Sequence, residues 1–287
     1  MKHIKKPSWL KVPPPWGESF SQTRRILNEY GLETVCKNAN CPNIGECFGS
    51  GTATFLIMGN VCTRNCRFCN IEGGKPLPLD EMEPKKIAKA VQLMKLTYAV
   101  VTSVTRDDLP DGGAAHFATT IQEIKKMNPS CGIEVLVPDF LGNLDSIRLV
   151  LDAEPDVFNH NVETVPRLYP LMRPSADYNR SLNVLKAASS GKRNIPVKSG
   201  IMVGAGETTG EIYQEFEDLN KSGVNILTIG QYLPPSRNHH PLDRYYTPEE
   251  FVDLKTRAIE AGIEKVISAP LARSSYHAKD VSSELFR

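Results

Sequence analysis

The sequence predicts a parallel β/α architecture that closes only partly, a partial (β/α)6 barrel. From residue 52 onward, β-rich apolar runs alternate with helical patterns, which is typical of a parallel sheet. There are six runs and six helical patterns, too few for an eightfold barrel. The length of 287 residues suits a barrel of ~250 residues with extensions. A doubly wound sheet would produce the same alternation, so the sequence leaves that architecture open.

The first 51 residues form a predicted N-terminal extension. They are rich in proline, asparagine and glycine, and one short helix is expected at Ser21–Tyr30, ended by Gly31. The rest is expected to be irregular. An irregular segment that contains several cysteines is usually stabilised by something other than an apolar core. A bound metal could stabilise this one.

The barrel is expected over residues 52–265. Its predicted strands are Thr54–Met58, Tyr98–Val104, Ile133–Val137, Val157–His160, Val197–Val203 and Ile226–Gln231. Its predicted helices are Pro84–Lys95, Ala114–Met127, Leu144–Asp152, Arg180–Ser189, Thr209–Ser222 and Pro248–Ala261. Pro84 and Pro248 stand in the first helical turn, where proline is tolerated. Residues 266–287 are expected to form a C-terminal tail.

The composition excludes several classes of protein. No apolar stretch approaches the ~18 residues of a membrane helix, so no membrane span is expected. The basic N-terminus is interrupted by Pro7 and has no apolar centre, unlike a secretory signal. A formal net charge of +1 gives no sign of the basic face that binds nucleic acid.

The chain has seven cysteines, and six of them fall in two tight groups between positions 36 and 69. A disulfide framework is expected in small secreted chains, which this is not. We therefore predict a cytoplasmic protein, in a reducing compartment, whose grouped cysteines are ligands. The seventh, Cys131, lies at the N-terminal end of the third strand run and is interpreted as a core residue.

The most informative group is the loop Cys62-Thr-Arg-Asn-Cys66-Arg-Phe-Cys69, directly after the first strand run. Catalytic loops of β/α barrels occupy this position. Three thiolates on a four-iron cluster leave one iron open, as in a catalytic metal site. Zinc is the alternative. However, a structural zinc site needs four ligands, and zinc ribbons use two C-x2-C pairs where this chain has one such step.

This loop, with Phe68 before the third cysteine, resembles the signature of the radical S-adenosylmethionine superfamily. The resemblance implies a partial barrel of radical SAM type and a catalytic 4Fe–4S cluster on Cys62, Cys66 and Cys69. It also implies that the open iron chelates the amino and carboxylate groups of S-adenosylmethionine.

Further cofactor contacts are expected at the ends of later strands. The segment Gly200-Ile-Met202-Val-Gly204-Ala-Gly-Glu resembles the G-x-I-x-G-x-x-E element of the superfamily, with Met202 in place of the usual isoleucine. A plain glycine-rich turn is the alternative. Asn161 and Glu163 follow the fourth strand run and are candidates to hold the ribose hydroxyls or the amino group. Polar residues 105–107 also follow a strand run.

Another cysteine triplet, Cys36-x4-Cys41-x5-Cys47, lies nearer the N-terminus and is the first triplet in chain order. This triplet and the C-terminal segment Arg273-Ser-Ser-Tyr276 make the resemblance more specific. Together with the second triplet, Cys62–Cys69, they resemble the lipoyl synthase family over nearly the whole chain. The resemblance implies an auxiliary 4Fe–4S cluster on the three cysteines with a serine as fourth ligand. We expect this serine to be Ser275, with Ser274 as the alternative.

The same resemblance implies the activity. Two sulfur atoms, drawn from the auxiliary cluster, would be inserted at C6 and C8 of a protein-bound octanoyl-lysine by radical chemistry. The implied partners are octanoylated carrier domains (2-oxoacid dehydrogenase acyltransferase subunits and the glycine cleavage H protein) and an electron donor such as flavodoxin or ferredoxin.

One functional alternative stays open at this stage. The chain could be a different radical SAM enzyme that uses the auxiliary cluster only for electron transfer.

Some further residues are left without a specific role. The pair His239-His240 is interpreted as part of a polar loop, and the sequence does not separate Arg173, Tyr178 and Arg237 from ordinary surface residues.

Overall fold

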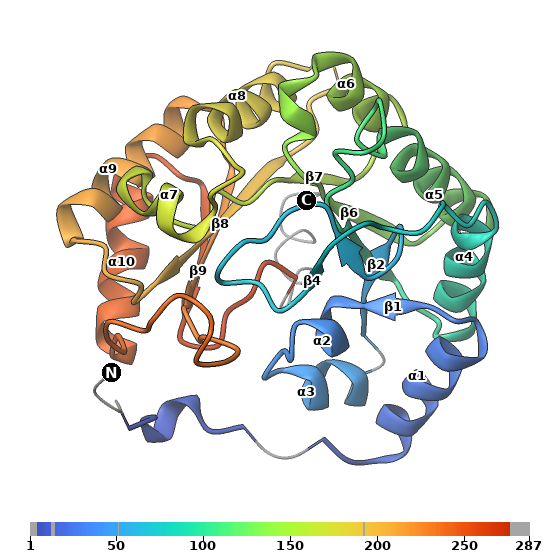
Figure 1. Ribbon diagram of the computed structural model, residues 1–287, viewed down its shortest axis with the longest axis horizontal. Coiled ribbons are helices and arrows are strands. Elements are labelled where there is room, and N and C mark those ends of the chain that lie inside the picture. Colours follow the sequence, from blue (N-terminus) through green and yellow to red (C-terminus); the bar gives the residue numbers. More distant parts are fainter. Residues whose placement is uncertain (1–4, 13–14, 51, 192, 276–287) are drawn as a thin grey trace.

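The protein, a computed structural model described over residues 5–12, 15–50, 52–191 and 193–275, is built on one curved sheet of eight strands (Figure 1). Its strand order is β1-β2-β5-β6-β7-β8-β9-β10. The strands are β1 (Glu33–Thr34), β2 (Thr54–Ile57), β5 (Tyr98–Ser103), β6 (Gly132–Leu136), β7 (Val157–Asn159), β8 (Val197–Val203), β9 (Ile226–Gln231) and β10 (Lys265–Ala269). All neighbours pair in parallel except β1, which runs antiparallel to β2.

Six helices follow strands β2 to β9 and lie outside the curved sheet (Figure 1). They are α4 (Glu83–Leu93), α5 (Ala114–Met127), α6 (Leu144–Asp152), α8 (Tyr178–Ser189), α9 (Thr209–Lys221) and α10 (Pro248–Glu260). Helices α9 and α10 each begin with a capping box, Thr208 with Glu211 and Thr247 with Glu250. Because these helices cover one face of the sheet only, the doubly wound alternative does not apply. The predicted partial barrel, with its six strands and six helices, is confirmed.

A seventh parallel strand, β10, was not predicted. It pairs with β9 from Lys265↔Ile226 to Ala269↔Gly230 and ends the sheet opposite β1. Only Val266 of its five residues is buried, and no periodic apolar pattern marks the strand in the sequence. The predicted boundary between barrel and tail at residue 265 stays a prediction, as does the one at residue 51; Tyr276 and residues 277–287 lie outside the described residues.

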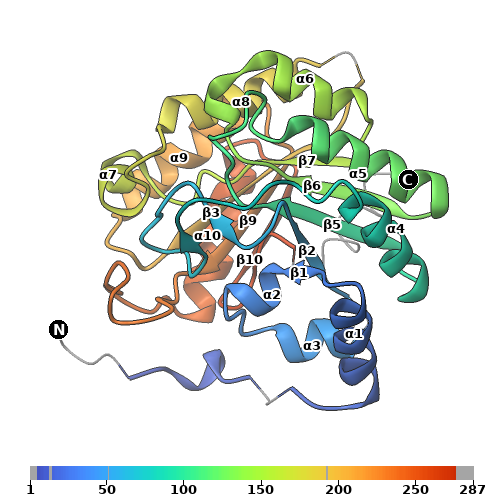
Figure 2. The same ribbon diagram turned by 45° about the vertical axis from the view of Figure 1, so that its right-hand side comes forward.

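The N-terminal extension packs against the open side of the barrel (Figure 2). The predicted helix appears as α1 (Glu18–Glu29). The expectation that the rest is irregular is wrong, because β1, α2 (Val35–Asn38) and α3 (Ile44–Gly49) are regular elements. They are too short for periodicity to reveal them.

Short contacts hold the extension together. The Thr34 hydroxyl accepts a bond from the Lys37 amide and caps α2. On α3, Phe48 is 3% exposed and packs on Phe20 with ring centroids 5.6 Å apart. A small apolar core therefore supports the segment that carries the first cysteine triplet.

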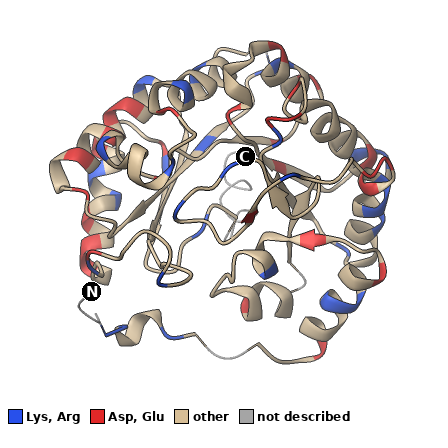
Figure 3. Ribbon diagram, in the orientation of Figure 1, with Lys and Arg blue, Asp and Glu red and all other residues tan. Residues whose placement is uncertain are grey.

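Smaller elements complete the chain. The two-stranded ladder β3 (Val61–Cys62) and β4 (Glu72–Gly73) flanks the second cysteine triplet, and η1 (Ser8–Leu10), η2 (Phe140–Gly142), η3 (Pro166–Leu168) and α7 (Tyr169–Met172) lie in connections. Within the described residues, no helix is long and apolar enough to cross a membrane. Basic and acidic residues are interspersed along the outer helices (Figure 3).

Phe216 on α9 tests the packing of helices on the outer face of the sheet. Its side chain is fully buried, so Phe216→Ala should lower the free energy of unfolding by about 3–5 kcal/mol through lost contacts and the cavity left behind. Urea unfolding measures the effect. Val252→Ala on α10, where the side chain is 62% exposed, is the control and should change stability by less than about 0.5 kcal/mol. Equal effects of the two substitutions would contradict this packing.

Candidate functional site

The candidate site is a cavity of about 530 Å³ enclosed by the barrel strands, both cysteine segments and the residues after β10. Most of the residues singled out in the sequence meet here. Those that line it are Cys36, Cys41, Cys62, Cys66, Phe68, Cys69, Asn161, Glu163, Gly200, Met202, Ser274 and Ser275. Cys47 and Gly204 are the predicted site residues that do not line it.

The second cysteine triplet lies on the loop after β2, held by backbone bonds. The sulfur of Cys62 accepts hydrogen bonds from the amides of Arg64 (3.4 Å) and Thr105 (3.3 Å). The Cys69 amide donates to the Cys66 carbonyl at 3.0 Å. The loop therefore has a defined shape that depends on the end of β5.

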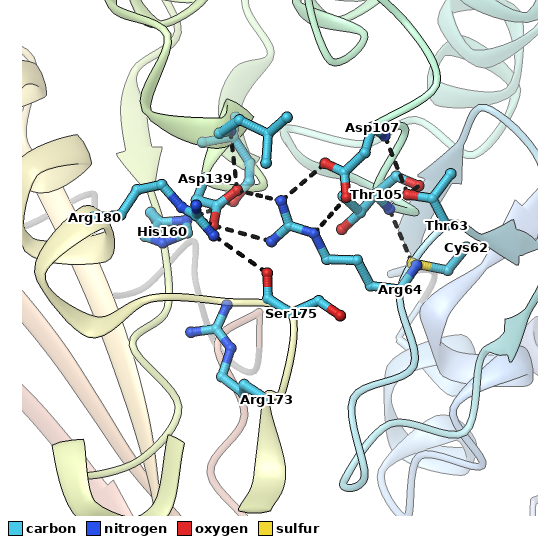
Figure 4. Close-up of polar contacts among 12 residues, drawn as sticks. Cys62, Thr63, Arg64, Thr105, Asp107, Asp139, His160, Arg173, Ser175 and Arg180 are labelled. Atoms are coloured by element: carbon cyan, nitrogen blue, oxygen red, sulfur yellow. Dashed lines mark hydrogen bonds and ion pairs between the residues drawn. The ribbon is translucent and has the colours of Figure 1, made fainter. Parts of the chain in front are cut away.

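A buried charge network fixes this loop (Figure 4). The Arg64 guanidinium bonds both oxygens of Asp107 (2.7 and 2.8 Å) and both oxygens of Asp139 (3.0 and 2.7 Å). Arg180 on α8 donates to Asp139 at 2.8 Å. Burial opposes ionisation of Asp139, but the hydrogen bonds and charge of Arg64 outweigh it and hold the Asp139 pKa below its usual range.

This network was missed in the sequence. Its members are 43 and 75 residues apart, so no local spacing connects them. The available signal was positional, because Asp107 and Asp139 follow the ends of β5 and β6, where polar residues of a β/α barrel converge.

The cysteine thiols of the site lie in surroundings that disfavour the charged thiolate form. Burial raises the pKa of Cys36 to about 11 and the pKa values of Cys47 and Cys69 to about 12. Burial also raises the pKa of Cys66, which the Arg173 charge opposes. The charges of Cys36 and Cys41 add to the effect of burial on the pKa of Cys47.

The donor set fits iron–sulfur clusters. Each triplet offers three soft sulfur ligands, and metal binding would remove the protons that burial retains. No three His, Cys, Asp or Glu side chains among the described residues are spaced to share one metal ion. Cluster ligands stand farther apart, because each binds a different iron. The buried Arg173 Nε has no hydrogen-bond partner within the described ranges, which suits an anionic group of a ligand in the cavity.

Three segments distant in sequence are joined around the first triplet. The Asn43 side chain, 2% exposed, donates to the Leu271 carbonyl at 2.8 Å. The Asn70 side chain donates to the Asn38 carbonyl at 2.9 Å. The two cysteine segments and the chain after β10 are therefore tied to one another by buried or half-buried amides.

The predicted cofactor residues at the ends of β7 and β8 contact one another. Asn161 donates to Glu163 at 3.1 Å, and Glu163 adopts a left-handed backbone, φ 69°. Burial raises the pKa of Glu163, opposed by the Arg173 charge. The Cβ of any residue replacing Gly200 would stand 2.8 Å from Asn161 Oδ1, so the glycine permits close packing.

Gly204 lies apart from this group. Its φ is 104°, and an added Cβ would collide with the side chain of Gln231 and the carbonyl of Arg244. These contacts explain the glycine without a cofactor, and its predicted contact with S-adenosylmethionine stays a prediction.

Three histidines lie in or beside the site: His160 and the pair His239-His240. His160, 1% exposed, bonds the Val137 carbonyl through Nδ1 at 2.9 Å, while its Nε2 has no partner among the described residues. Burial lowers its pKa to about 4, so the imidazole is neutral at pH 7. His239 reaches the Cys69 carbonyl through Nε2 at 3.2 Å, and His240 reaches the Ala205 carbonyl at 2.9 Å.

The chain is similar to several known proteins. The family model of the Radical SAM superfamily matches residues 56–219. A lipoyl synthase of Caldanaerobacter subterraneus subsp. tengcongensis is 54% identical, covering 99% of this chain and 99% of the relative. A lipoyl synthase of Roseiflexus sp. (strain RS-1) is 52% identical, covering 96% of this chain and 91% of the relative.

Solved structures support the fold alone, because their sequence identity is low. Methylornithine synthase superposes with a TM-score of 0.54 at 13% identity, over 93% of this chain and 91% of its own. HydG, a maturase of the [FeFe]-hydrogenase, gives 0.58 at 14% identity, over 87% of this chain and 68% of its own.

Asp139→Asn tests the charge network. The substitution removes the buried carboxylate that Arg64 and Arg180 share and leaves Arg64 paired with Asp107 alone, so it should lower the free energy of unfolding by about 3 kcal/mol. Since the folded pKa of Asp139 is lowered, this contribution is present above its usual pKa and disappears as the pH falls through the folded value.

Urea unfolding of the anaerobically purified protein measures the loss. The control is Asp145→Asn, whose exposed pair with Arg148 should contribute less than about 1 kcal/mol. A loss no larger than that of the control would rule out a stabilising network.

His160→Asn tests the neutral imidazole while keeping a donor for the Val137 carbonyl. Between the folded pKa of about 4 and the usual 6.5, the folded protein binds fewer protons than the unfolded chain, so stability rises with pH. The asparagine variant should lose this dependence, about 1.4 kcal/mol per pH unit. Unfolding curves from pH 5 to 7 give the difference between the two proteins, and a difference independent of pH would contradict the lowered pKa.

Proposed function

The chain belongs to the lipoyl synthase family of the radical S-adenosylmethionine superfamily, and we propose on that premise that it inserts two sulfur atoms, at C6 and C8, into a protein-bound octanoyl-lysine. The observation that carries the proposal is the convergence of five of the six grouped cysteines and a serine pair on one cavity. A radical SAM enzyme with one cluster would need only the triplet at Cys62–Cys69.

In this proposal Cys62, Cys66 and Cys69 hold the catalytic 4Fe–4S cluster. Arg64 and Thr105 orient Cys62 through their backbone amides. Outer contacts of this kind set the geometry and electronics of a metal ligand. The ion pair of Arg64 with Asp139 keeps the loop in this conformation.

Cys36, Cys41 and Cys47 hold the second, auxiliary cluster, and Ser275 supplies its fourth ligand. A serine oxygen is a harder ligand than a thiolate and suits iron in such a cluster less well. The serine-bound iron should therefore detach first, which suits a cluster that gives up sulfur. When bound, the two clusters and S-adenosylmethionine supply the one-electron chemistry and the sulfur atoms that side chains lack.

The remaining cavity residues would bind the cofactor and the acyl chain and shield the reaction from water. Phe68 and Met202 offer apolar surface to the cofactor, and Asn161 with Glu163 offers hydrogen-bonding groups. Arg173 supplies positive charge beside Cys66. Leu136, Leu233 and Pro234 add apolar wall, which suits an acyl chain and excludes water from the reacting carbon.

The partners follow from the substrate. An octanoyl group on a carrier lysine must enter the cavity, so we propose transient docking of octanoylated 2-oxoacid dehydrogenase acyltransferase domains and of the glycine cleavage H protein. Flavodoxin or ferredoxin would supply electrons. A cytoplasmic location belongs to the same proposal, because the six grouped cysteines must stay reduced to bind iron.

The decisive experiment incubates the reconstituted protein with octanoylated H protein, S-adenosylmethionine and a reductant. Mass spectrometry of the carrier should show the gain of two sulfur atoms, as the dithiol under the reducing conditions of the assay and with two hydrogens fewer once the dithiol is oxidised in air. Cofactor cleavage without a sulfur gain would indicate a different radical SAM enzyme. Analysis of iron, sulfide and zinc on anaerobic protein addresses the zinc alternative, since each triplet should hold about four irons.

Ser275→Ala should abolish sulfur insertion while cofactor cleavage continues, because only the auxiliary cluster loses a ligand. Liquid chromatography of the cleaved cofactor and mass spectrometry of the carrier report the two steps separately. Ser274→Ala is the matched control. If Ser274→Ala alone removes sulfur insertion, the fourth ligand is Ser274.

A further inference from the structure

A buried ion pair at the inner face of the barrel has no role in the chemistry described so far. Lys198 on β8 and Glu134 on β6 are each 1% exposed, and Lys198 Nζ donates to both carboxylate oxygens at 2.9 and 3.0 Å. Glu134 also accepts from Asn159 Nδ2 at 3.0 Å and from the Tyr98 hydroxyl at 3.2 Å. The carboxylate therefore connects four adjacent strands.

The third hydrogen bond of Lys198 is made to a residue outside the sheet. Its Nζ donates to the backbone carbonyl of Ser274 at 2.6 Å, from a residue 76 positions away in the chain. The Ser274 hydroxyl donates to Asn161 Oδ1 at 3.0 Å and accepts from Asn161 Nδ2 at 2.7 Å. Both the main chain and the side chain of Ser274 are thus held, and we call Lys198, Glu134 and Asn161 the serine anchor.

Gly200 makes room for the anchor. A Cβ at this position would stand 3.0 Å from the Ser274 hydroxyl and 2.8 Å from Asn161 Oδ1, both too close for an ordinary contact. Gly200 was expected to contact a cofactor, and its place beside Ser274 gives it a second reason to be glycine. The segment is held on its other side by the bond from Asn43 to the Leu271 carbonyl.

Stability alone does not account for the ion pair. Two buried charges lose their hydration, and well-packed apolar side chains of similar size are often as stable. An apolar pair, however, could not bind the Ser274 carbonyl. A lysine ammonium has three donors, and here Glu134 takes two of them and the C-terminal segment takes the third.

We propose that Lys198, held by Glu134, is a positioning residue that fixes the backbone at Ser274 so that Ser275 faces the auxiliary cysteines. The inference rests on the proposed function, since it takes Ser275 as a cluster ligand. It also gives the two serines separate roles. Ser274 is held by the barrel, and Ser275 remains for iron.

The test compares Lys198→Met in the Glu134→Gln background with Tyr98→Phe. The double substitution removes both charges together, so no unpaired charge is left buried, and it deletes the donor to Ser274. Tyr98→Phe removes a different hydrogen bond to Glu134 and leaves the Lys198–Ser274 contact intact. Thermal unfolding checks that all variants are folded, and Lys198→Met with Glu134→Met, an apolar pair of similar size, is a second variant if the first is not.

Two measurements report positioning. Amide exchange of residues 271–275 in the reconstituted protein should rise about tenfold in the double variant, as expected for the loss of a charged hydrogen bond, and stay unchanged in Tyr98→Phe. Mössbauer spectra of ⁵⁷Fe-reconstituted protein should lose the oxygen-ligated iron in the double variant, as in Ser275→Ala, while cofactor cleavage persists.

The outcomes separate the inference from the function. If Ser275→Ala removes the oxygen-ligated iron and the double variant retains it with unchanged exchange, Lys198 does not position the serine and the inference is overturned. If Ser275→Ala leaves the spectrum unchanged, the serine ligand itself is wrong, and the inference falls with it. Absence of sulfur insertion by the unmodified protein contradicts the proposed function, whatever the spectra show.

Discussion

The low polarity of the cavity around the cysteine thiols is the constraint on which the rest of the site depends. Burial raises the pKa of Cys36, Cys47 and Cys69 well above the usual value, so these thiols keep their protons at neutral pH. The protein can therefore hold several thiols close together without the repulsion that thiolates would cause, and in the proposed function cluster binding would remove the protons. The protein must then hold the thiols by other means.

Those means are hydrogen bonds between distant segments. Arg64 ties one cysteine loop to the ends of β5 and β6, and Asn43 ties the other cysteine segment to Leu271. Each tie uses a buried or half-buried polar group whose partner would be costly to remove. The cysteine segments are therefore organised mainly by polar contacts to the barrel, and the barrel by its apolar core.

This difference between an apolar barrel core and cysteine segments held by polar contacts explains which features could be predicted from the sequence. Periodicity revealed the strands and helices around the core, because their apolar pattern repeats over many residues. The five-residue β10 and the four-residue α2 gave too short a pattern. The grouped cysteines could be identified from their spacing. The contacts of Asp139 and Lys198 could not, since their partners are far along the chain. In addition, a charged residue within a strand, such as Lys198, gives no sequence signal that it is buried.

The hydrogen bonds that hold the two cysteine segments also imply an order in which these segments can adopt their final structure during synthesis. Every partner of the Cys62 loop in the charge network has been synthesised once Arg180 leaves the ribosome. The segment from Cys36 to Cys47 comes earlier in the chain, yet the partner of Asn43, Leu271, is synthesised 228 residues after it. Domains can begin to fold during synthesis, so the two metal centres of the proposal would become competent at different moments. The proposed auxiliary site would form only after the segment around Leu271 has been synthesised.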